Sequence, residues 1–206
     1  MLRRIVVDVA DKTIRQDLER YKRRAIELGA TDAKIIRSSD VVVENRVLAK
    51  CLFPRCPVSG TNIHCPPHAP DVEKIRRMVK EFQHGLFFKL DGPYDGSTAS
   101  SQKMKLKNLE IVGKIEAQAY YDGYYLAVGF GGASCKTTLC PEQECSALQP
   151  GQPCRHPLRG RPSMHAVGMD AYKMAVWAGW DIYPIGRATV PSDVPFVSHL
   201  GVILIY

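Results

Sequence analysis

Several features that would assign the protein to a familiar class are missing from the sequence. No apolar run approaches the ~20 residues needed to cross a bilayer, so we expect no membrane span. The first residues, MLRRIVVDVADK, include a short β-branched run, but charged residues follow at once, without a small-residue cleavage site for secretion. No G-x-S-x-G, H-E-x-x-H or dinucleotide-binding fingerprint occurs. We therefore expect a cytoplasmic protein outside the common hydrolase, metalloprotease and dinucleotide-dependent classes.

The sequence also lacks the pattern of a nucleic-acid-binding protein. The formal net charge is a moderate +7, and basic residues gather in RYKRR (20–24) and HPLRGRP (156–162). Either segment could meet an anion or an acidic redox protein. No basic stretch is interleaved with aromatic side chains, and no nucleic-acid motif is present. We therefore do not expect nucleic acid as a partner.

The spacing of apolar residues predicts helices and strands in alternation. In the first helix, for example, Ile14, Leu18, Tyr21 and Ala25 recur at intervals of three and four residues. Strands are predicted at residues 3–10, 32–39, 41–50, 86–90, 124–130, 181–186 and 201–206, and helices at residues 11–28, 71–83, 102–121 and 162–178. This order predicts an α/β fold, with α+β as the alternative.

The segment DGPYDGSTASS, residues 91–101, separates two similar halves. Each half, about residues 11–90 and 102–206, has the order helix, strand, cysteine segment, helix, strand. We expect the halves to form one compact metal-binding domain over residues 1–206. The matched cysteine spacing in the halves indicates an internal duplication.

Cysteine is the most informative residue type in this chain. All 7 cysteines lie in two short windows, and each window contains the spacing C-x4-C-x8-C. The first window holds Cys51, Cys56 and Cys65, and the second holds Cys135, Cys140, Cys145 and Cys154. A reduced cytoplasmic chain uses clustered thiols for metal or redox chemistry more often than for disulfides. We therefore predict that all of these cysteines are metal or cofactor ligands.

The four thiols of the second window can complete the coordination shell of a metal centre. Structural zinc is usually bound by C-x2–4-C pairs; the C-x4-C pairs here lie at the outer edge of that range, and no C-x2-C occurs. Longer gaps suit the larger [4Fe–4S] cluster, and cysteine followed by proline recurs near such clusters. This chain has Cys56-Pro57, Cys65-Pro66 and Cys140-Pro141. The pattern favours one or two [4Fe–4S] clusters, with zinc as the alternative.

The three thiols of the first window leave one coordination position open. A cluster bound there would have either an iron free to bind substrate or a fourth ligand that is not cysteine. His64 and His68 are the nearest candidates, and each has an alternative role as a loop residue. The two windows could also contribute ligands to a single shared site.

Two further segments have both a functional and a structural interpretation. GFGGASC, residues 129–135, follows a predicted strand but lacks the G-K-[ST] ending of a phosphate loop. We expect its glycines to let the backbone lie close to the metal centre. Arg159 and Arg161 precede a predicted helix and could bind an anion there, or could be solvated loop residues. We assign His84, His165 and His199 to structural roles.

Both cysteine windows resemble the signatures of a known family. KCLFPRCPVSGTNIHCPPHAP is similar to its first signature, and CKTTLCPEQECSALQPGQPCRHPLRGRPSMHAVGMD to its second. The family consists of cysteine-rich, iron–sulfur-like proteins described as predicted metal-binding proteins, common in anaerobic archaea and bacteria. The resemblance covers roughly residues 30 to 185, and it implies a metal and a cytoplasmic setting but no particular reaction. One departure is His165, where the family pattern has an acidic residue.

The sequence therefore predicts an iron–sulfur protein with a redox role. This role is either electron transfer or, in an oxidoreductase, reduction of a small substrate at the three-cysteine centre. Its expected partner is accordingly a redox protein or a small molecule. The alternative is a zinc-binding structural or interaction module without catalytic activity. A third possibility is metal carriage, with an exchangeable site at the first window.

Overall fold

The computed structural model describes residues 3–186 and 188–206. Over these residues the chain forms one antiparallel sheet of four strands, in the order β1-β2-β4-β3. The strands are β1 (Asp32–Arg37), β2 (His84–Gly92), β3 (Val128–Phe130) and β4 (Val197–Leu204). The mixed α and β class expected from the sequence is confirmed. Because every pair of neighbouring strands is antiparallel, it takes the α+β form.

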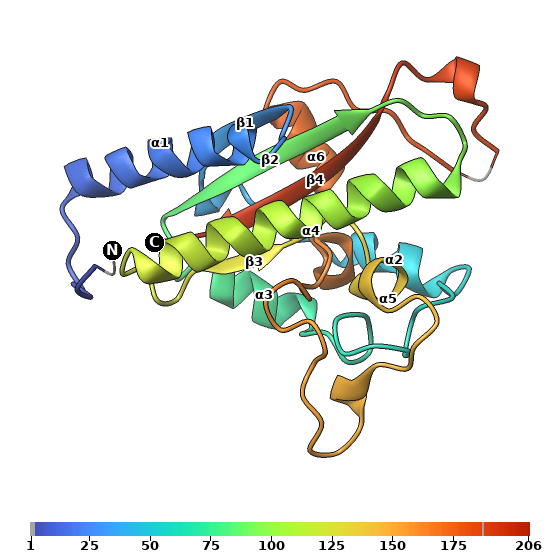
Figure 1. Cartoon of the computed structure of the whole chain (residues 1–206), viewed down its shortest axis with the longest axis horizontal. Coiled ribbons are helices and arrows are strands. Elements are labelled where there is room, and N and C mark those ends of the chain that lie inside the picture. Colours follow the sequence, from blue (N-terminus) through green and yellow to red (C-terminus); the bar gives the residue numbers. More distant parts are fainter. Residues whose placement is uncertain (1–2, 187) are drawn as a thin grey trace.

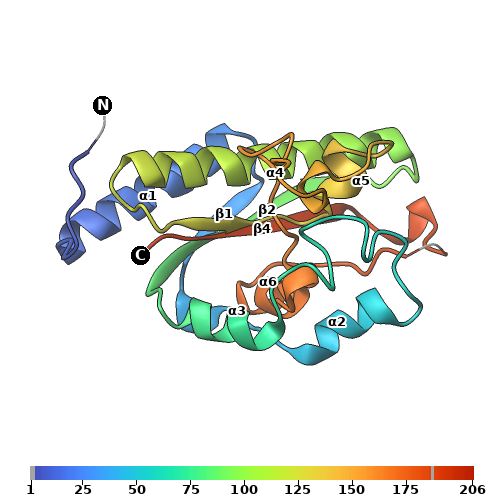
Figure 2. The same ribbon diagram turned by 90° about the horizontal axis from the view of Figure 1, so that it is seen from below.

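Helices cover both faces of the sheet, as Figure 2 shows. One face carries α1 (Asp11–Glu27) and α4 (Thr98–Tyr121), and the other carries α3 (Val72–Val79) and α6 (Ala171–Trp177). Two further helices, α2 (Asn45–Leu52) and α5 (Cys135–Leu139), lie at the end of the sheet where the cysteine segments are found. Single 3₁₀ turns are η1 (Ser38–Asp40), η2 (Ser146–Leu148), η3 (His165–Val167) and η4 (Pro191–Asp193).

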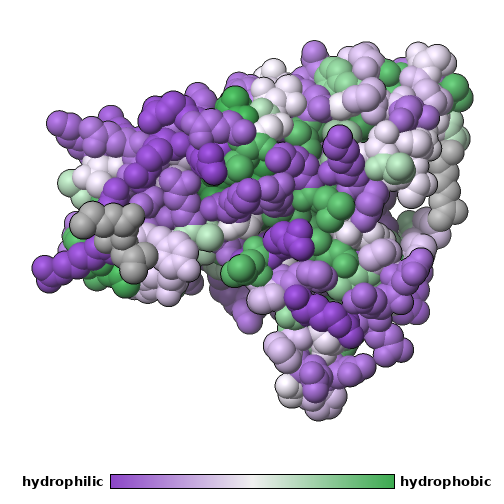
Figure 3. All heavy atoms as spheres, viewed as in Figure 1, coloured by the Kyte–Doolittle hydropathy of each residue, from purple (hydrophilic) through white to green (hydrophobic). Residues whose placement is uncertain are grey.

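Two hydrophobic cores form because successive side chains of a strand point to opposite faces. In β2, Leu86 and Phe88 pack with α1 and α4, whereas Phe87 packs with α3 and α6. In β4, Ile203 belongs to the first core, and Val202 to the second. The outward sides of α1 and α4 are mainly hydrophilic (Figure 3), as expected for helices that bury one face only.

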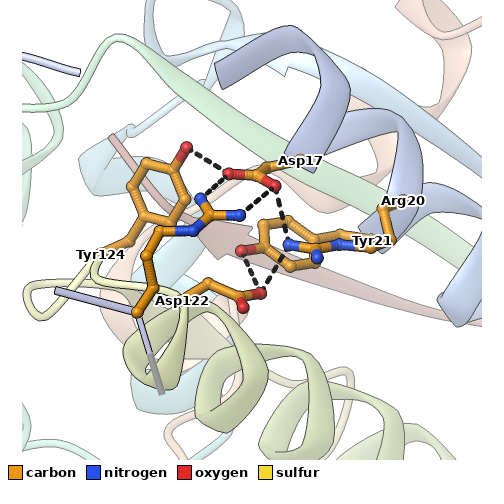
Figure 4. A network of polar contacts seen from close by, with 6 residues as sticks. Asp17, Arg20, Tyr21, Asp122 and Tyr124 are labelled. Atoms are coloured by element: carbon orange, nitrogen blue, oxygen red, sulfur yellow. Dashed lines mark hydrogen bonds and ion pairs between the residues drawn. The ribbon is translucent and has the colours of Figure 1, made fainter. Parts of the chain in front are cut away.

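A network of polar contacts fixes the start of the chain to the first core (Figure 4). Asp17 of α1, only 4% exposed, accepts hydrogen bonds from Arg3 at 3.0 Å, Arg20 at 2.7 Å and Tyr124 at 2.9 Å. Arg20 also bonds Asp122, just after α4, at 2.7 Å. The network therefore connects residues near the N-terminus, α1 and the end of α4.

Three predicted strands are absent from the structure. Residues 3–10 form no strand, because a β-branched run needs a neighbouring strand. Their described backbone bonds to other segments join Arg3 to Tyr121 and the Ala10 carbonyl to the first turn of α1, and none joins a strand. Most of residues 41–50 instead form helix α2, which contains the helix-favouring residues Leu48, Ala49 and Lys50. Residues 181–186 also form no strand, since Pro184 cannot donate to a ladder and both sides of β4 are already paired.

The helix predicted at residues 162–178 is divided into η3 and α6. Gly168 lies between them with φ +82°, a left-handed conformation that ends the first piece. Asp170 then caps α6, because its side chain accepts a hydrogen bond from the Lys173 backbone N–H. The other predicted elements are present with shifted ends.

The order helix, strand, cysteine segment, helix, strand is present in both halves of the chain. The first half contributes α1, β1, α3 and β2, and the second contributes α4, β3, α6 and β4. The two inner strands, β2 and β4, pair with each other at the centre of the sheet. The duplication itself stays a prediction. Among the described residues, no helix is both long and apolar enough to cross a membrane.

Candidate metal centre

The two cysteine segments lie side by side at one end of the sheet (Figure 1). The first begins in the last turn of α2 and continues through a loop to α3, and the second begins with α5. His64 Nδ1 lies 3.3 Å from Cys135 Sγ, and Cys65 Sγ lies 3.4 Å from Ser134 Oγ. The two windows are therefore in direct contact, although about 70 residues separate these partners in the chain.

All four cysteines of the second window line one small pocket. Its volume is about 20 Å³, and residues of the first segment, Asn62 and His64, form part of its wall. The cysteines come from α5 and from the loop that follows it: Cys135, Cys140, Cys145 and Cys154. The fold thus gathers around one space the four thiols that the sequence predicts as a ligand set.

The three cysteines of the first window lie within electrostatic reach of one another. The Cys56 N–H donates a hydrogen bond to the Cys51 carbonyl at 3.0 Å, which turns the chain between them. Burial raises the pKa of Cys51, and the charges of Cys56 and Cys65 raise it further. Cys65 is itself buried, with 6% of its surface exposed. These three thiols form a second group beside the first.

Cys135 has the most strongly shifted thiol pKa of the site. Burial is the largest cause and raises the pKa to about 12, and the charges of other cysteines, Cys65 first among them, contribute in the same direction. Cys65 belongs to the first window, so it interacts electrostatically with both groups. Buried neighbouring thiols resist ionisation, and a bound metal cation compensates by stabilising the thiolates.

Every cysteine is a free thiol in the structure. Over residues 3–186 and 188–206, no group of three or more His, Cys, Asp and Glu side chains is arranged so that it could hold a single metal ion. The four thiols of the second window line the pocket of about 20 Å³, but they do not converge on a single point within it. The assignment of the seven cysteines as ligands stays a prediction that this clustering supports.

The histidines proposed as extra ligands occupy different environments. His64 lies against the second window and not only beside the first, where the sequence placed it. Burial lowers the pKa of His64 and the charge of Arg161 lowers it further, so its ring is neutral at pH 7. His68 is exposed, and only its backbone N–H bonds Cys65. Of the two, His64 is the better placed to contact a bound metal centre.

Asn62 and Ser134 lie beside the thiols, and the sequence reasoning singled out neither. Asn62 is 1% exposed, and its side chain donates to the Val58 carbonyl at 3.2 Å and accepts from the His64 N–H at 3.1 Å. Ser134 caps α5 by accepting a hydrogen bond from the Lys136 N–H at 3.3 Å. Their residue types could have indicated a turn or a helix cap at these two positions, because Asn and Ser are typical of both.

The glycines of GFGGASC contact helix α4 and strand β4, and not the thiols. A Cβ on Gly132 would lie 2.6 Å from the Leu200 carbonyl oxygen, and one on Gly131 would lie 2.7 Å from Leu109. The Gly132 N–H donates to Asn108 Oδ1 at 2.8 Å, and Asn108 also bonds the Leu200 carbonyl at 3.0 Å. The expectation that these glycines lie close to the metal centre was therefore wrong. They fix the start of the second cysteine segment to the core.

Of the two interpretations of Arg159 and Arg161, the anion site is not supported by the contacts of Arg161. Arg161 Nε donates to Glu116 Oε2 at 2.8 Å, and Glu116 in turn accepts from the Gly129 N–H. This pairing raises the pKa of Arg161 and neutralises its charge locally. Gly160 next to it lies close to the thiols, since a Cβ there would be 3.3 Å from Cys154 Sγ. Arg161 therefore holds the cysteine segment against α4.

The fold and the site define an α+β protein with its cysteines clustered at one end of the sheet. A family model described as "Predicted metal-binding protein (DUF2284)" matches residues 34–205, and the chain belongs to this family. No curated protein and no solved structure matches the chain. The family expected from the two cysteine signatures is confirmed, and its iron–sulfur character stays a prediction.

Proposed function

We propose that the protein is an iron–sulfur protein with a redox role. The single observation that carries this proposal is the pocket lined by all four cysteines of the second window. The gaps of four, four and eight residues between these cysteines suit a [4Fe–4S] cluster better than the short pairs typical of zinc. Cys135, Cys140, Cys145 and Cys154 would hold this cluster.

The donor types at the site are those that bind such a cofactor, and the space of about 20 Å³ between the thiols would have to widen to admit a cluster. All seven thiols are free, and the pocket wall combines Leu139 and His64 with the cationic residues Lys136 and Arg155, which would offset the negative charge of a thiolate-bound cluster. The His156 N–H donates to Cys154 Sγ at 3.4 Å, and hydrogen bonds of this kind to ligand sulfur tune the reduction potential of a bound cluster. When bound, an iron–sulfur cluster supplies one-electron transfer.

The first window would hold a second centre through Cys51, Cys56 and Cys65. With three thiols it offers either an open coordination position for a small substrate or a position for a histidine. The two groups are adjacent, because His64 contacts Cys135. This adjacency supports electron exchange between a redox partner and a small molecule, in a reduced cytoplasmic setting. A net charge of +7 favours an acidic redox partner.

Zinc is the second candidate for the metal. It is favoured by one observation, the small volume of about 20 Å³ enclosed by the second-window thiols. No three of these side chains within residues 3–186 and 188–206 are already arranged to hold one ion, so the thiols would have to move together around zinc. Metal binding would then order the long loops and contribute mainly to folding. The protein would in that case be a structural or interaction module.

Anaerobic purification followed by iron, zinc and acid-labile sulfide analysis distinguishes these candidates. An iron–sulfur protein is brown, contains iron and sulfide in equal amounts, and gives an electron paramagnetic resonance signal on reduction. Replacement of Cys145 by serine should remove the signal of the second-window cluster, and His68→Ala should leave it unchanged. Zinc without sulfide would replace the first candidate by the second, and a protein free of both metals would reject both.

A further inference from the structure

A cavity without cysteines lies between the start of α4, the start of β4 and the segment that leads into α6. Its volume is about 280 Å³, close to the lower end of the range for small-molecule sites, about 300 Å³. Its wall is largely aromatic, apolar and hydroxylic. The residues with chemical functions that matter here are Ser101, Lys105, His165, Tyr172, Tyr183 and His199.

Lys105 gives this cavity a positive charge. Its ammonium group makes no hydrogen bond or ion pair with any other residue that the structure describes. Ser97, Ser101 and Lys105 follow one another at intervals of four, so they share one face of α4 near its positive N-terminal end. Asp95 also lines the cavity, but its carboxylate already accepts hydrogen bonds from the Ser97 N–H at 2.8 Å and the Ser100 hydroxyl at 2.6 Å.

The two histidines of the wall add neutral polar groups. Burial lowers the pKa of His199 to about 4, helped by the charge of Lys105, and burial also lowers the pKa of His165. His199 Nε2 is buried and has no hydrogen-bond partner among the described residues. His165 packs edge-on against Tyr172, with 5.5 Å between the ring centroids. Among the described residues that line the cavity, Lys105 is therefore the one that carries a positive charge.

We propose that this cavity binds a small organic carboxylate. The carboxylate would pair with Lys105 and the Ser101 hydroxyl, and the apolar body of the ligand would lie against Tyr172 and Tyr183. Lys105 is the one cation among the described residues of the wall, and the exposed Asp95 carboxylate adds a negative charge to the same wall. A ligand with a single negative charge therefore suits the cavity better than a phosphate dianion, which needs more cationic groups. The proposal goes beyond the metal centre and does not depend on which metal is bound there.

The cavity is joined to both cysteine segments through the chain. Gly132 lines the cavity and lies three residues before Cys135. His165 belongs to η3, which packs against α2, and the last turn of α2 carries Cys51. A carboxylate in the cavity would therefore lie next to the segments that position the thiols. From there a bound substrate or effector could act on the metal centre.

Binding is tested by isothermal titration calorimetry on the full chain, with benzoate, 4-hydroxybenzoate and pyruvate as probes. Benzamide, a neutral analogue of benzoate, and inorganic phosphate serve as comparisons. We expect at least one carboxylate to bind saturably, and benzoate to bind at least about tenfold more tightly than benzamide because only benzoate pairs with Lys105. Amide chemical shifts should change around Tyr172 and His199.

Substitutions on α4 assign the effect to one lysine. Lys105→Gln should remove the preference for benzoate over benzamide, and Lys105→Arg should restore most of it. Lys103→Gln is the matched control, since Lys103 is exposed on the same helix and does not line the cavity. All three variants should keep the metal content of the unmodified protein. The proposal is overturned if no carboxylate binds, if Lys105→Gln leaves the preference intact, or if phosphate binds better than every carboxylate.

Discussion

His64 Nδ1 lies 3.3 Å from Cys135 Sγ, and this contact joins the two cysteine windows. His64 was a candidate ligand for the first window, yet its ring helps to wall the pocket of the second. Cys65, the next residue, interacts electrostatically with Cys51 on one side and Cys135 on the other. The short segment Asn62–Cys65 is therefore the structural link between the two groups of thiols.

His64→Ala should expose the thiol pocket and weaken metal retention. We expect the metal-loaded variant to lose its metal to a chelator about tenfold faster, because water and chelator gain access to the site. His68→Ala is the matched control, since the His68 side chain is exposed in the same loop. Metal release is followed by absorbance. Equal release rates for both variants would show that His64 does not protect the site.

Cys145→Ser distinguishes two metal centres from one shared centre. If each window holds its own centre, this variant should lose about half of the bound metal and keep the remainder. Cys56→Ser should likewise lose the complementary half, as measured by elemental analysis of protein purified anaerobically. Complete loss of metal in both variants would instead mean that the two windows form a single site.

Asp17→Asn should destabilise the fold in a pH-dependent way. Burial acts to raise the pKa of Asp17, but the hydrogen bonds and charges of its partners, Arg3 foremost, outweigh burial and lower this pKa. The ionised carboxylate therefore stabilises the protein above the unfolded-state value of about 3.9, and this contribution is lost as the pH falls through the folded-state value. We expect the free energy of unfolding to drop by about 2 kcal/mol at pH 7, and by less at pH 3, which lies below the unfolded-state value.

Urea denaturation at the two pH values measures this difference. The control is Glu27→Gln, which removes an exposed ion pair with Arg24 and should change stability by less than about 1 kcal/mol at either pH. An equal loss for Asp17→Asn at pH 7 and pH 3 would contradict the assigned role of its charge.

Gly113→Ala should destabilise the protein and disturb the second cysteine segment. Gly113 is buried on α4, and an added Cβ would collide with the carbonyl oxygen of Leu158, four residues after Cys154. We expect a loss of about 1–3 kcal/mol in the free energy of unfolding, even though alanine favours helices by about 1 kcal/mol over glycine. Thermal unfolding and metal content are the measurements.

Gly186→Ala is the matched control for this substitution. A Cβ at Gly186 would meet only the Thr189 hydroxyl, at 4.0 Å, so little change is expected. If Gly113→Ala is as stable as this control and retains its metal, then α4 does not constrain the cysteine loop.

Local patterns predicted the elements that depend on one buried stripe or one short apolar run. The repeat of Ile14, Leu18 and Tyr21 located α1, and all three side chains are at most 3% exposed. The run LFFKL located β2, which the structure extends to His84–Gly92. The strand predicted at residues 41–50 was wrong. The valines of this run favour a strand, but the chain after Glu44 has no neighbouring strand and forms α2.

The site shows the same division between local pattern and tertiary contact. The spacing of Cys135, Cys140, Cys145 and Cys154 predicted one group of thiols, and these four residues do line one pocket. The roles of Asn108 and Arg161 could not be predicted, because their partners, Leu200 and Glu116, are 92 and 45 positions away. Such contacts leave no periodic signal in a single sequence.

Spacing and periodicity, which are local properties, were enough to predict two sets of clustered thiols and a mixed α and β fold, and the resemblance of the two cysteine signatures predicted the family that the family model shows. Only the tertiary structure decided that the two sets touch through His64, that Arg161 is engaged by Glu116, and that a cavity with one unpaired lysine lies beside the thiol segments. These features depend on how α4 and β4 bring distant residues together, and that arrangement is set by burial of the two cores and not by any one segment.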